Sequence, residues 1–125
     1  MDFDENKLTR EIMQERYSKY GTCPVAVAIG KIGGKWKPII IYILSHGTCR
    51  FSELLRMIEG VSKTMLTAQL RELEKDRLIH REVFAEVPPR VEYSLTELGK
   101  TLRPVMMSLC EWSEANVLRQ EVCEN

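Results

Sequence analysis

The segment from Val61 to Ile79, VSKTMLTAQLRELEKDRLI, is the part of this chain that most constrains its fold. Ser62 is a residue type favoured at a helix N-cap, because its hydroxyl can accept a hydrogen bond from a free backbone N–H of the first turn. Leu66, Leu70 and Leu73 recur in steps of four and three, so at about 100° per residue they share one face. The spacing predicts an amphipathic helix that begins at Ser62 and packs its leucines inward.

The opposite face of this predicted helix carries short hydrogen-bond donors and two cations, and no carboxylate. Its residues are Lys63, Thr64, Thr67, Ala68 and Arg71. Such a row suits the phosphate-lined groove of a nucleic acid, because cations and hydroxyls bind phosphates and base edges. Glu74 lies close enough to the row to count against this interpretation. The plain alternative is a solvated helix face.

The flanking segments favour the nucleic-acid interpretation. Ser52 is predicted to cap a short helix, FSELLRMI, which turns Leu54, Leu55 and Ile58 inward and ends at Gly60. Two short helices joined by a tight Gly-containing turn, here at residues 59–61, are typical of a helix-turn-helix. Residues 79–85 and 91–94 are strand-like, and the connection between them contains two prolines that keep it out of a sheet. The sequence therefore predicts a winged helix: mainly α, with a small β-hairpin.

The N-terminal part is expected to supply further helices. Residues 4–19 form a weakly amphipathic helix or a loose arm, so residues 1–22 are assigned to an N-terminal segment. Pro24 is tolerated at the first helical position, which makes Cys23 an N-cap, and Gly33-Gly34 breaks this helix. Pro38 opens the next, almost wholly apolar helix, which we expect to lie in the core and to end at Gly47. Lys35 and Lys37, ahead of that helix, are candidate phosphate contacts.

The C-terminal part, residues 96–125, is predicted to begin with Thr96 as the cap of one long helix. Its apolar residues alternate in steps of four and three, which is a heptad pattern suited to a subunit contact. They are Leu98, Leu102, Val105, Leu109 and Trp112. The stripe is short and Pro104 should bend it, so the alternative is that it simply belongs to the core. The sequence is otherwise consistent with one domain spanning 1–125, whose DNA-binding part is 23–95.

Composition limits the function classes. Lys plus Arg equals Asp plus Glu at 18 each, so nucleic-acid binding must come from a local patch of charge. The four cysteines have no zinc-site spacing, so we expect free thiols and no metal. No nucleophile with a base and no phosphate-binding Gly-rich loop is apparent, so we expect neither an enzyme nor a cofactor. The acidic start and the lack of a long apolar run predict a cytoplasmic protein without membrane contact.

Three motifs carry a resemblance to a known family. They are IGGKW at residues 32–36, the LTxxLRxLE frame at 66–74 and PPRVEYSLTELG at 88–99. With the segments around them, from Cys23 to about Trp112, they closely resemble the HxlR-type family of bacterial winged helix-turn-helix transcription regulators, which is distantly related to the MarR group.

The resemblance implies a homodimer on an inverted-repeat operator in double-stranded DNA. We expect a repressor, with an activator as the open alternative. Residues 62–76 would form the recognition helix, the hairpin around Arg90 the wing, and the N- and C-terminal helices the dimer contact. Some members of the family sense oxidants or electrophiles through a cysteine at the position of Cys23. Cys49 and Cys123 depart from the family pattern, which leaves the sensing scheme open.

The residues themselves also favour Cys23 as a sensor. The partial positive charge at a helix start favours the thiolate that electrophiles attack. Cys110 is expected on the apolar side of the last helix, Cys49 in a loop and Cys123 in a frayed tail. The alternative for Cys23 is a small residue that fills space at the dimer contact. A regulator controlled by a non-covalent ligand also stays open.

Arg90 is expected to reach a phosphate or a minor groove from the hairpin tip, and its alternative is an ordinary exposed turn charge. The competing function for the whole chain is a winged helix that contacts only other proteins, since a fold does not dictate its function. Binding to DNA that weakens steeply as salt is added would favour the DNA-binding function, whereas a null result that does not depend on salt would favour this alternative.

Overall fold

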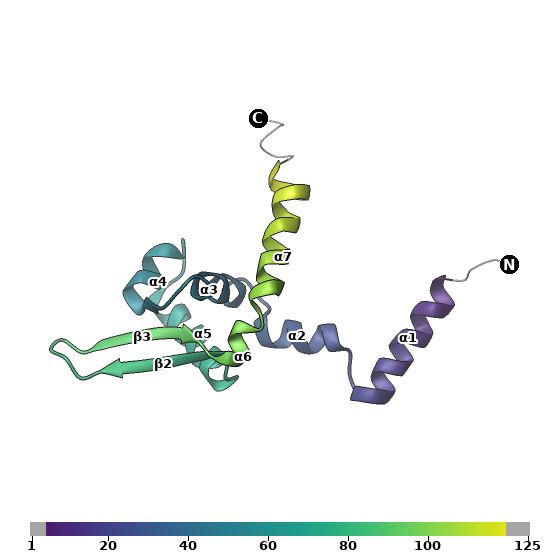
Figure 1. Cartoon of the computed structure of the whole chain (residues 1–125), viewed down its shortest axis with the longest axis horizontal. Coiled ribbons are helices and arrows are strands. Elements are labelled where there is room, and N and C mark those ends of the chain that lie inside the picture. Colours follow the sequence, from purple (N-terminus) through teal and green to yellow (C-terminus); the bar gives the residue numbers. More distant parts are fainter. Residues whose placement is uncertain (1–4, 120–125) are drawn as a thin grey trace. The chain divides into compact units, whose positions relative to one another are not determined.

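The computed structural model describes residues 5–119 and is mainly helical, with one small sheet. Its elements are α1 (Glu5–Tyr20), α2 (Pro24–Ile32), α3 (Lys37–Leu44), β1 (Cys49–Arg50), α4 (Phe51–Met57), α5 (Lys63–Lys75), β2 (Ile79–Phe84), β3 (Arg90–Leu95), α6 (Glu97–Lys100), α7 (Arg103–Ser113) and the π-helical turn η1 (Glu114–Leu118). Helix, turn, helix and hairpin follow in the order of a winged helix, which confirms the predicted fold class (Figure 1).

The chain divides into two compact units, the first ending at Gly34 and the second beginning at Lys35. The first contains α1 and α2, so the helix after Cys23 groups with the N-terminal segment and not with the DNA-binding part. Within residues 5–119, no helix is both long enough and apolar enough to cross a membrane.

The core of the second unit is built from the helix faces that the apolar spacing predicted. Leu66 and Leu73 of α5 are completely buried and Leu70 is 2% exposed. Ile40 and Ile41 of α3 are also completely buried, as expected for the most apolar helix of the chain. Burial of such side chains is the main stabilising contribution to a domain of this size. The core therefore holds α5 against α3 and fixes which of its faces is presented to solvent.

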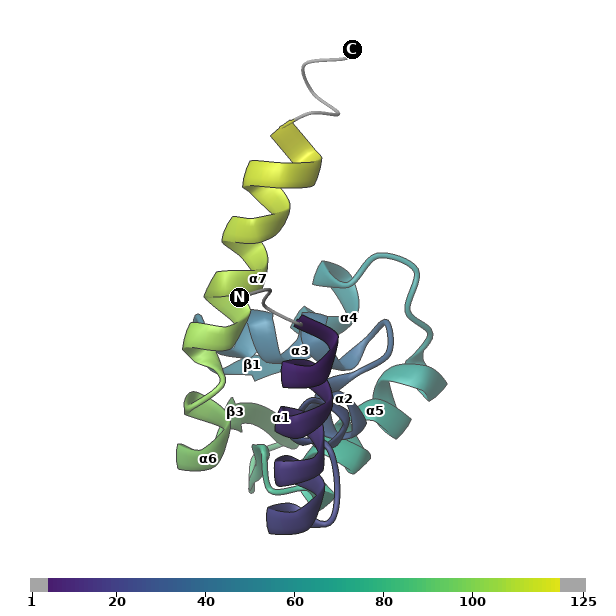
Figure 2. The same cartoon turned by 90° about the vertical axis from the view of Figure 1, so that its right-hand side faces the viewer.

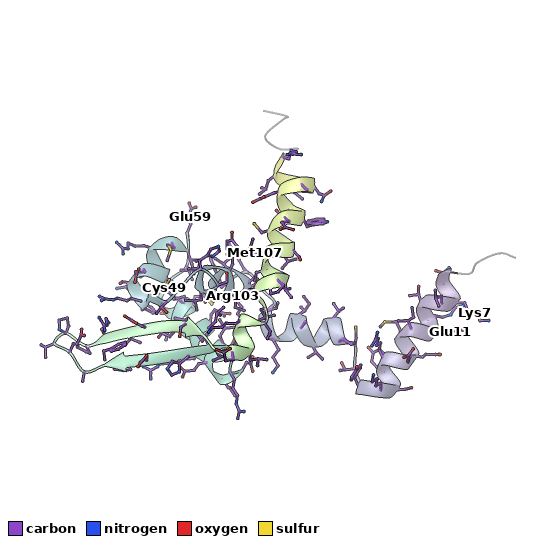
Figure 3. The ribbon with its side chains drawn as sticks, in the orientation of Figure 1. Lys7, Glu11, Cys49, Glu59, Arg103 and Met107 are labelled. Carbon is purple, nitrogen blue, oxygen red and sulfur yellow. The ribbon has the colours of Figure 1, made fainter. Side chains whose placement is uncertain are left out.

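The turn between α4 and α5 has the geometry that a helix-turn-helix requires. Gly60 has a φ of +84°, a left-handed conformation that glycine adopts without steric cost. The side chain of Glu59, at the same turn, points away from the helices (Figure 3). The α4 start was predicted wrongly: the helix begins at Phe51, after Arg50, and not behind a Ser52 cap. The carboxylate of Glu53 satisfies this helix end by accepting a hydrogen bond from the Arg50 backbone N–H at 3.0 Å.

The sheet has the order β1-β3-β2, with both pairs antiparallel. The two-residue strand β1 pairs Cys49 with Tyr93. The β2–β3 hairpin is the wing, and it extends beyond the helices that pack against its base (Figure 1). Its tip is formed by residues 85–89, where Val87 is fully exposed.

The prediction of one long C-terminal helix was wrong. Thr96 does cap a helix, since its hydroxyl accepts from the Gly99 N–H at 3.0 Å, but α6 ends at Lys100. A separate helix, α7, then begins at Arg103 with Pro104 in its first turn, where the missing N–H costs nothing (Figure 2). Pro104 thus starts a helix and does not bend one, and Leu98 of α6 does not belong to the α7 stripe. Similarly, α3 ends at Leu44 and is capped at Ser45, before Gly47.

Candidate nucleic-acid interface

Helix α5 begins as the sequence predicted. The Ser62 hydroxyl accepts a hydrogen bond from the Met65 N–H at 3.1 Å, which satisfies one of the free donors of the first turn. Because the three core leucines fix the rotation of the helix, its other side faces solvent. Ser62 remains exposed beside this side.

The solvent side of α5, called here the α5 row, contains the predicted residues and one more. Lys63, Thr64, Ala68 and Arg71 are exposed, whereas Thr67 is half-buried. The Thr67 hydroxyl donates to the Lys63 backbone carbonyl at 2.8 Å, so only its lone pairs are free for another donor. Sequence reasoning missed Lys75, which is also exposed. Its spacing of four residues from Arg71 was sufficient to place it on the same face.

The carboxylates of α5 are neutralised by partners outside the helix. Glu72 lies 2.7 Å from the Lys37 ammonium, and Glu74 lies 3.5 Å from the Arg81 guanidinium. Within residues 5–119, no ion pair involves the row cations, which are Lys63, Arg71 and Lys75. The objection raised by Glu74 is thereby weakened, and the α5 row carries net positive charge.

The two lysines ahead of α3 differ in their surroundings. The Lys37 side chain is only 13% exposed and bound to Glu72, so in this structure it joins α3 to α5 and is not available to a phosphate. Lys35 is exposed, and its ammonium lies 4.7 Å from the centre of the Trp36 ring. Only Lys35 keeps the accessibility that a phosphate contact requires.

Arg90 is not the free tip charge that the sequence predicted. It is the first residue of β3, and its guanidinium lies 3.4 Å from a Glu86 carboxylate oxygen and 3.2 Å from one of Glu92. The same group stacks 4.2 Å from the centre of the Phe84 ring, the residue directly opposite in the hairpin. Two carboxylates and a cation–π contact hold it at the base of the tip. Arg90 thus contributes to the shape of the wing more than to its charge.

A polar cleft of 240 Å³ lies between α5 and the sheet, and no local sequence pattern predicted it. It is lined by Thr67, Leu70, Arg71, Glu74, Arg81 and Tyr93. Burial, more than any neighbouring charge, raises the pKa of the Tyr93 hydroxyl. Tyr93 is therefore a protonated donor at neutral pH. The cleft is continuous with the α5 row, because both contain Thr67 and Arg71.

The apolar stripe of α7 is exposed, and the alternative that it belongs to the core does not fit this exposure. Val105 is 44%, Leu109 53% and Trp112 61% exposed, whereas Met106 on the adjoining face is 3% exposed and packs inward. Leu102 is half-buried, and Leu98 lies on α6. Apolar side chains exposed in such a contiguous stripe are typical of an interaction surface.

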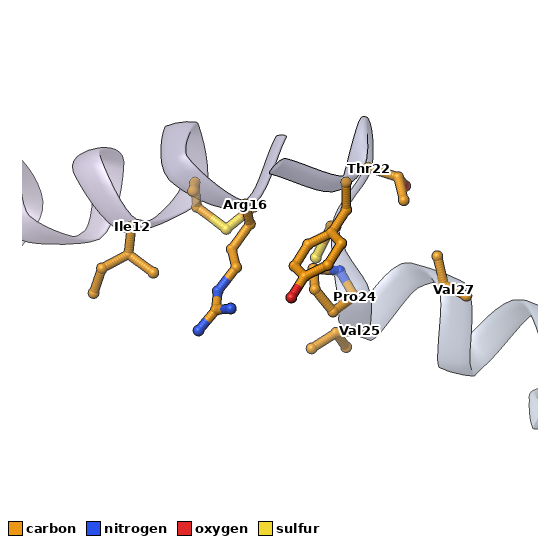
Figure 4. Close-up of a pocket in the computed structure, with 9 residues that line it drawn as sticks. Ile12, Arg16, Thr22, Pro24, Val25 and Val27 are labelled. Carbon is orange, nitrogen blue, oxygen red and sulfur yellow. The ribbon is translucent and has the colours of Figure 1, made fainter. Parts of the chain in front are cut away.

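Cys23 is the N-cap residue of α2, with Pro24 in the first turn and no acidic residue there. Its half-buried side chain lines a groove of 670 Å³ between α1 and α2, within the first unit. Arg16, Pro24 and Val25 point into the same groove (Figure 4). The thiol is therefore accessible to a reagent that enters the groove.

The other thiols lie in different surroundings. Cys49 is buried in β1 and not in a loop, and burial, followed by the charge of Glu53, raises its pKa. The Cys110 sulfur is half-buried, 3.7 Å from the Tyr42 hydroxyl and 3.4 Å from a Glu114 carboxylate oxygen. Cys123 lies outside the described residues. No group of three or more His, Cys, Asp or Glu side chains in the described part of the chain is arranged to hold a metal ion.

Comparison with known proteins identifies the family of this chain. The family described as HxlR-like helix-turn-helix matches residues 31–121, which include the whole of the α5 row, the polar cleft and the wing. The chain belongs to this family. The match confirms the resemblance carried by the three sequence motifs.

Relatives and solved structures agree with the HxlR-like assignment. The HTH-type transcriptional regulator YybR of Bacillus subtilis is 51% identical over 94 residues, which cover 75% of each chain. The redox regulator HypR in its reduced form is 48% identical, with a TM-score of 0.74 over 82% of this chain and 98% of HypR. The reduced form of the regulator YodB from B. subtilis is 34% identical, with a TM-score of 0.66 over 77% and 95%.

These relatives place the chain among DNA-binding transcriptional regulators and not among enzymes. The α5 row follows the HTH turn, where a helix-turn-helix presents its recognition helix to the major groove. The family assignment and the charge of the α5 row thus indicate the same surface.

Proposed function

We propose that this HxlR-like regulator is a dimeric repressor that binds an inverted-repeat operator and releases it when Cys23 is modified by an oxidant or electrophile. Helix α5 enters the major groove, where Thr64 and Arg71 meet base edges and Lys63 and Lys75 meet phosphates. Lys35 adds a backbone contact, and the wing lies along the neighbouring part of the duplex. No cofactor is required.

The observation that carries this proposal is the charge of the α5 row. Its two flanking carboxylates are paired with Lys37 and Arg81, whereas its own cations have no carboxylate partner in the described part of the chain. A chain with no net charge thereby presents a positive ridge on the helix that follows the HTH turn. A polyanion is attracted to such a patch even when the whole molecule is neutral.

The dimer contact is proposed to use the exposed apolar stripe of α7 together with the apolar side chains of α1. Leu8, Ile12 and Tyr17 of α1 are 41%, 45% and 53% exposed. A two-fold dimer would place two recognition helices about 34 Å apart, one turn of DNA, which explains the need for an inverted repeat.

The first prediction tests the α5 row. Arg71→Ala should weaken binding to duplex DNA from beside the protein's own gene by about 1–3 kcal/mol, because a bidentate contact to a base is lost. Binding is measured by titration at fixed salt, with the thermal midpoint as a check on folding. Lys100→Ala is the matched control, since Lys100 is a cation on α6 outside the row and pairs with Glu97 at 3.0 Å.

Equal affinities for Arg71→Ala and Lys100→Ala would mean that the α5 row is only solvated. If the wild-type protein bound no DNA, or bound it without dependence on salt, a protein-contact module would replace the regulator as the function.

The second prediction tests Cys23. Diamide or a quinone should release wild-type protein from its operator and should leave Cys23→Ser bound, because modification of the accessible thiol at the start of α2 is the proposed signal. The redox relative HypR supports this expectation. Cys49→Ser is the matched control, since Cys49 is buried, and it should release like the wild type. Equal release from wild type and Cys23→Ser, or no release from either, would assign the signal to another cysteine or to a non-covalent ligand.

A further inference from the structure

The polar cleft lies between α5 and the β2–β3 hairpin, which are separate segments of the sequence. In the hairpin, Arg81 lies directly opposite Tyr93. Directly opposite residues of an antiparallel pair project from the same face, with their Cβ atoms about 5 Å apart. Arg71 and Glu74 reach the cleft from α5, one turn apart. The cleft therefore exists only when the wing base is packed on the recognition helix.

The charges of the cleft favour an anion. Two guanidinium groups, of Arg71 and Arg81, face one carboxylate, of Glu74. Glu74 lies against the Arg81 Nε at 3.5 Å, so the terminal N–H groups of this guanidinium remain for another acceptor. The Arg81 side chain is 47% exposed, and solvent reaches the cleft. The Tyr93 hydroxyl adds a neutral donor.

We propose that this cleft binds one phosphate of the DNA backbone, held by the terminal N–H groups of Arg81 and by the Tyr93 hydroxyl. Arg71 lines the cleft and also belongs to the α5 row. The DNA backbone would therefore pass Arg71 on its way from the major groove to the wing. Glu74 positions Arg81 for this contact. Arg81, rather than Arg90, is then the arginine through which the hairpin holds DNA. The inference rests on the proposed function, because it presupposes that α5 enters the groove.

The test measures affinity for operator and for scrambled duplex over a range of salt concentrations. Arg81→Ala should weaken binding to both duplexes alike and make the slope of log affinity against log salt shallower by about one unit per subunit. Arg81→Lys should keep the wild-type slope, because it keeps the charge. Tyr93→Phe should weaken binding to both duplexes several-fold and leave the salt slope unchanged, because it removes a neutral hydrogen-bond donor.

Two further variants separate a phosphate contact from a purely structural ion pair. Arg90→Ala is the matched control, an arginine of the same hairpin that is held by two carboxylates, and it should leave the slope unchanged. Glu74→Gln should bind scrambled duplex at least as tightly as the wild type, because a repulsive charge is removed while the amide oxygen can still accept from the Arg81 Nε and hold it in place. A structural pair would instead make Glu74→Gln and Arg81→Ala equally defective.

The inference is overturned if wild-type binding depends on salt and folded Arg81→Ala keeps the full slope, or if Arg81→Lys behaves like Arg81→Ala. If Arg81→Ala does not fold, an unchanged affinity of Tyr93→Phe for both duplexes also overturns it. Absence of salt-dependent DNA binding by the wild type would overturn the proposed function itself, which is a distinguishable outcome.

Discussion

Leu109→Glu is expected to yield a monomer that binds the operator at least about 100-fold more weakly than the wild type. Leu109 is 53% exposed within the chain, in the apolar stripe of α7. At a two-fold contact one substitution places two carboxylates in the same apolar interface, and burial of unpaired charge is costly. Loss of the second recognition helix then removes the gain from simultaneous binding to both half-sites, which is typically about 100-fold or more. Light scattering gives the oligomeric state, and titration gives the affinity.

Met107→Glu is the matched control for this prediction. Met107 lies on the same helix and is 44% exposed, and because it is two residues from both Val105 and Leu109 it points to the other side of the helix from the stripe. It receives the same charge and should remain a dimer with normal affinity. If Leu109→Glu also remained dimeric at micromolar concentration, or if the wild type were monomeric, the α7 stripe would not be the subunit contact.

Gly99→Ala is expected to destabilise the fold by about 3 kcal/mol, near the upper end of what overpacking costs. A Cβ built on Gly99 would overlap the Leu78 carbonyl oxygen and would lie 3.3 Å from the Leu95 Cβ. The nearest atom belongs to the backbone, so no side-chain rotation relieves the clash. α6 and the segment that enters β2 would have to separate. Urea unfolding monitored by circular dichroism measures the loss.

Gly30→Ala provides the control for this substitution. Gly30 lies inside α2, and a Cβ there meets nothing within 4 Å. Because alanine is the better helix former, the change should be neutral or stabilising, by up to about 1 kcal/mol. A Gly99→Ala protein as stable as the wild type would show that the contact between α6 and the segment that enters β2 can widen at little cost.

The clash at Gly99 also explains part of the motif that carried the resemblance. In LTELG, Leu95 is buried, Thr96 caps α6, and Gly99 permits the close approach to Leu78. The Thr96 hydroxyl in addition donates to the Arg77 carbonyl at 2.6 Å. The motif therefore joins the segment that follows α5 to the segment after the wing. Its conformational requirements are those of the fold and not of DNA contact.

Local patterns along the chain account for much of the fold. The leucine spacing and the Ser62 cap defined α5 and its solvent face. The Gly60 turn separated α4 from α5, and the prolines of residues 88–89 separated the two strands of the hairpin. These predictions depended on periodicity and capping, which act over one or two helical turns. The same local patterns predicted the helix starts at α4 and α7 wrongly. At α4 a Glu53 carboxylate replaced a Ser52 cap, and at α7 a proline started a helix.

The charges of the interface were decided by tertiary structure. Lys37 and Glu72 are far apart in the sequence but meet at 2.7 Å, and only the packing of α3 on α5 creates that pair. Packing also pairs Arg90 with two carboxylates, buries Cys49 in a strand, and brings Arg81 and Tyr93 next to α5. The sequence by itself determined which face of α5 is polar, because helical periodicity is local. Which charges remain available on that face was decided only by the tertiary structure, because ion pairing depends on the distance between side chains brought together by the fold.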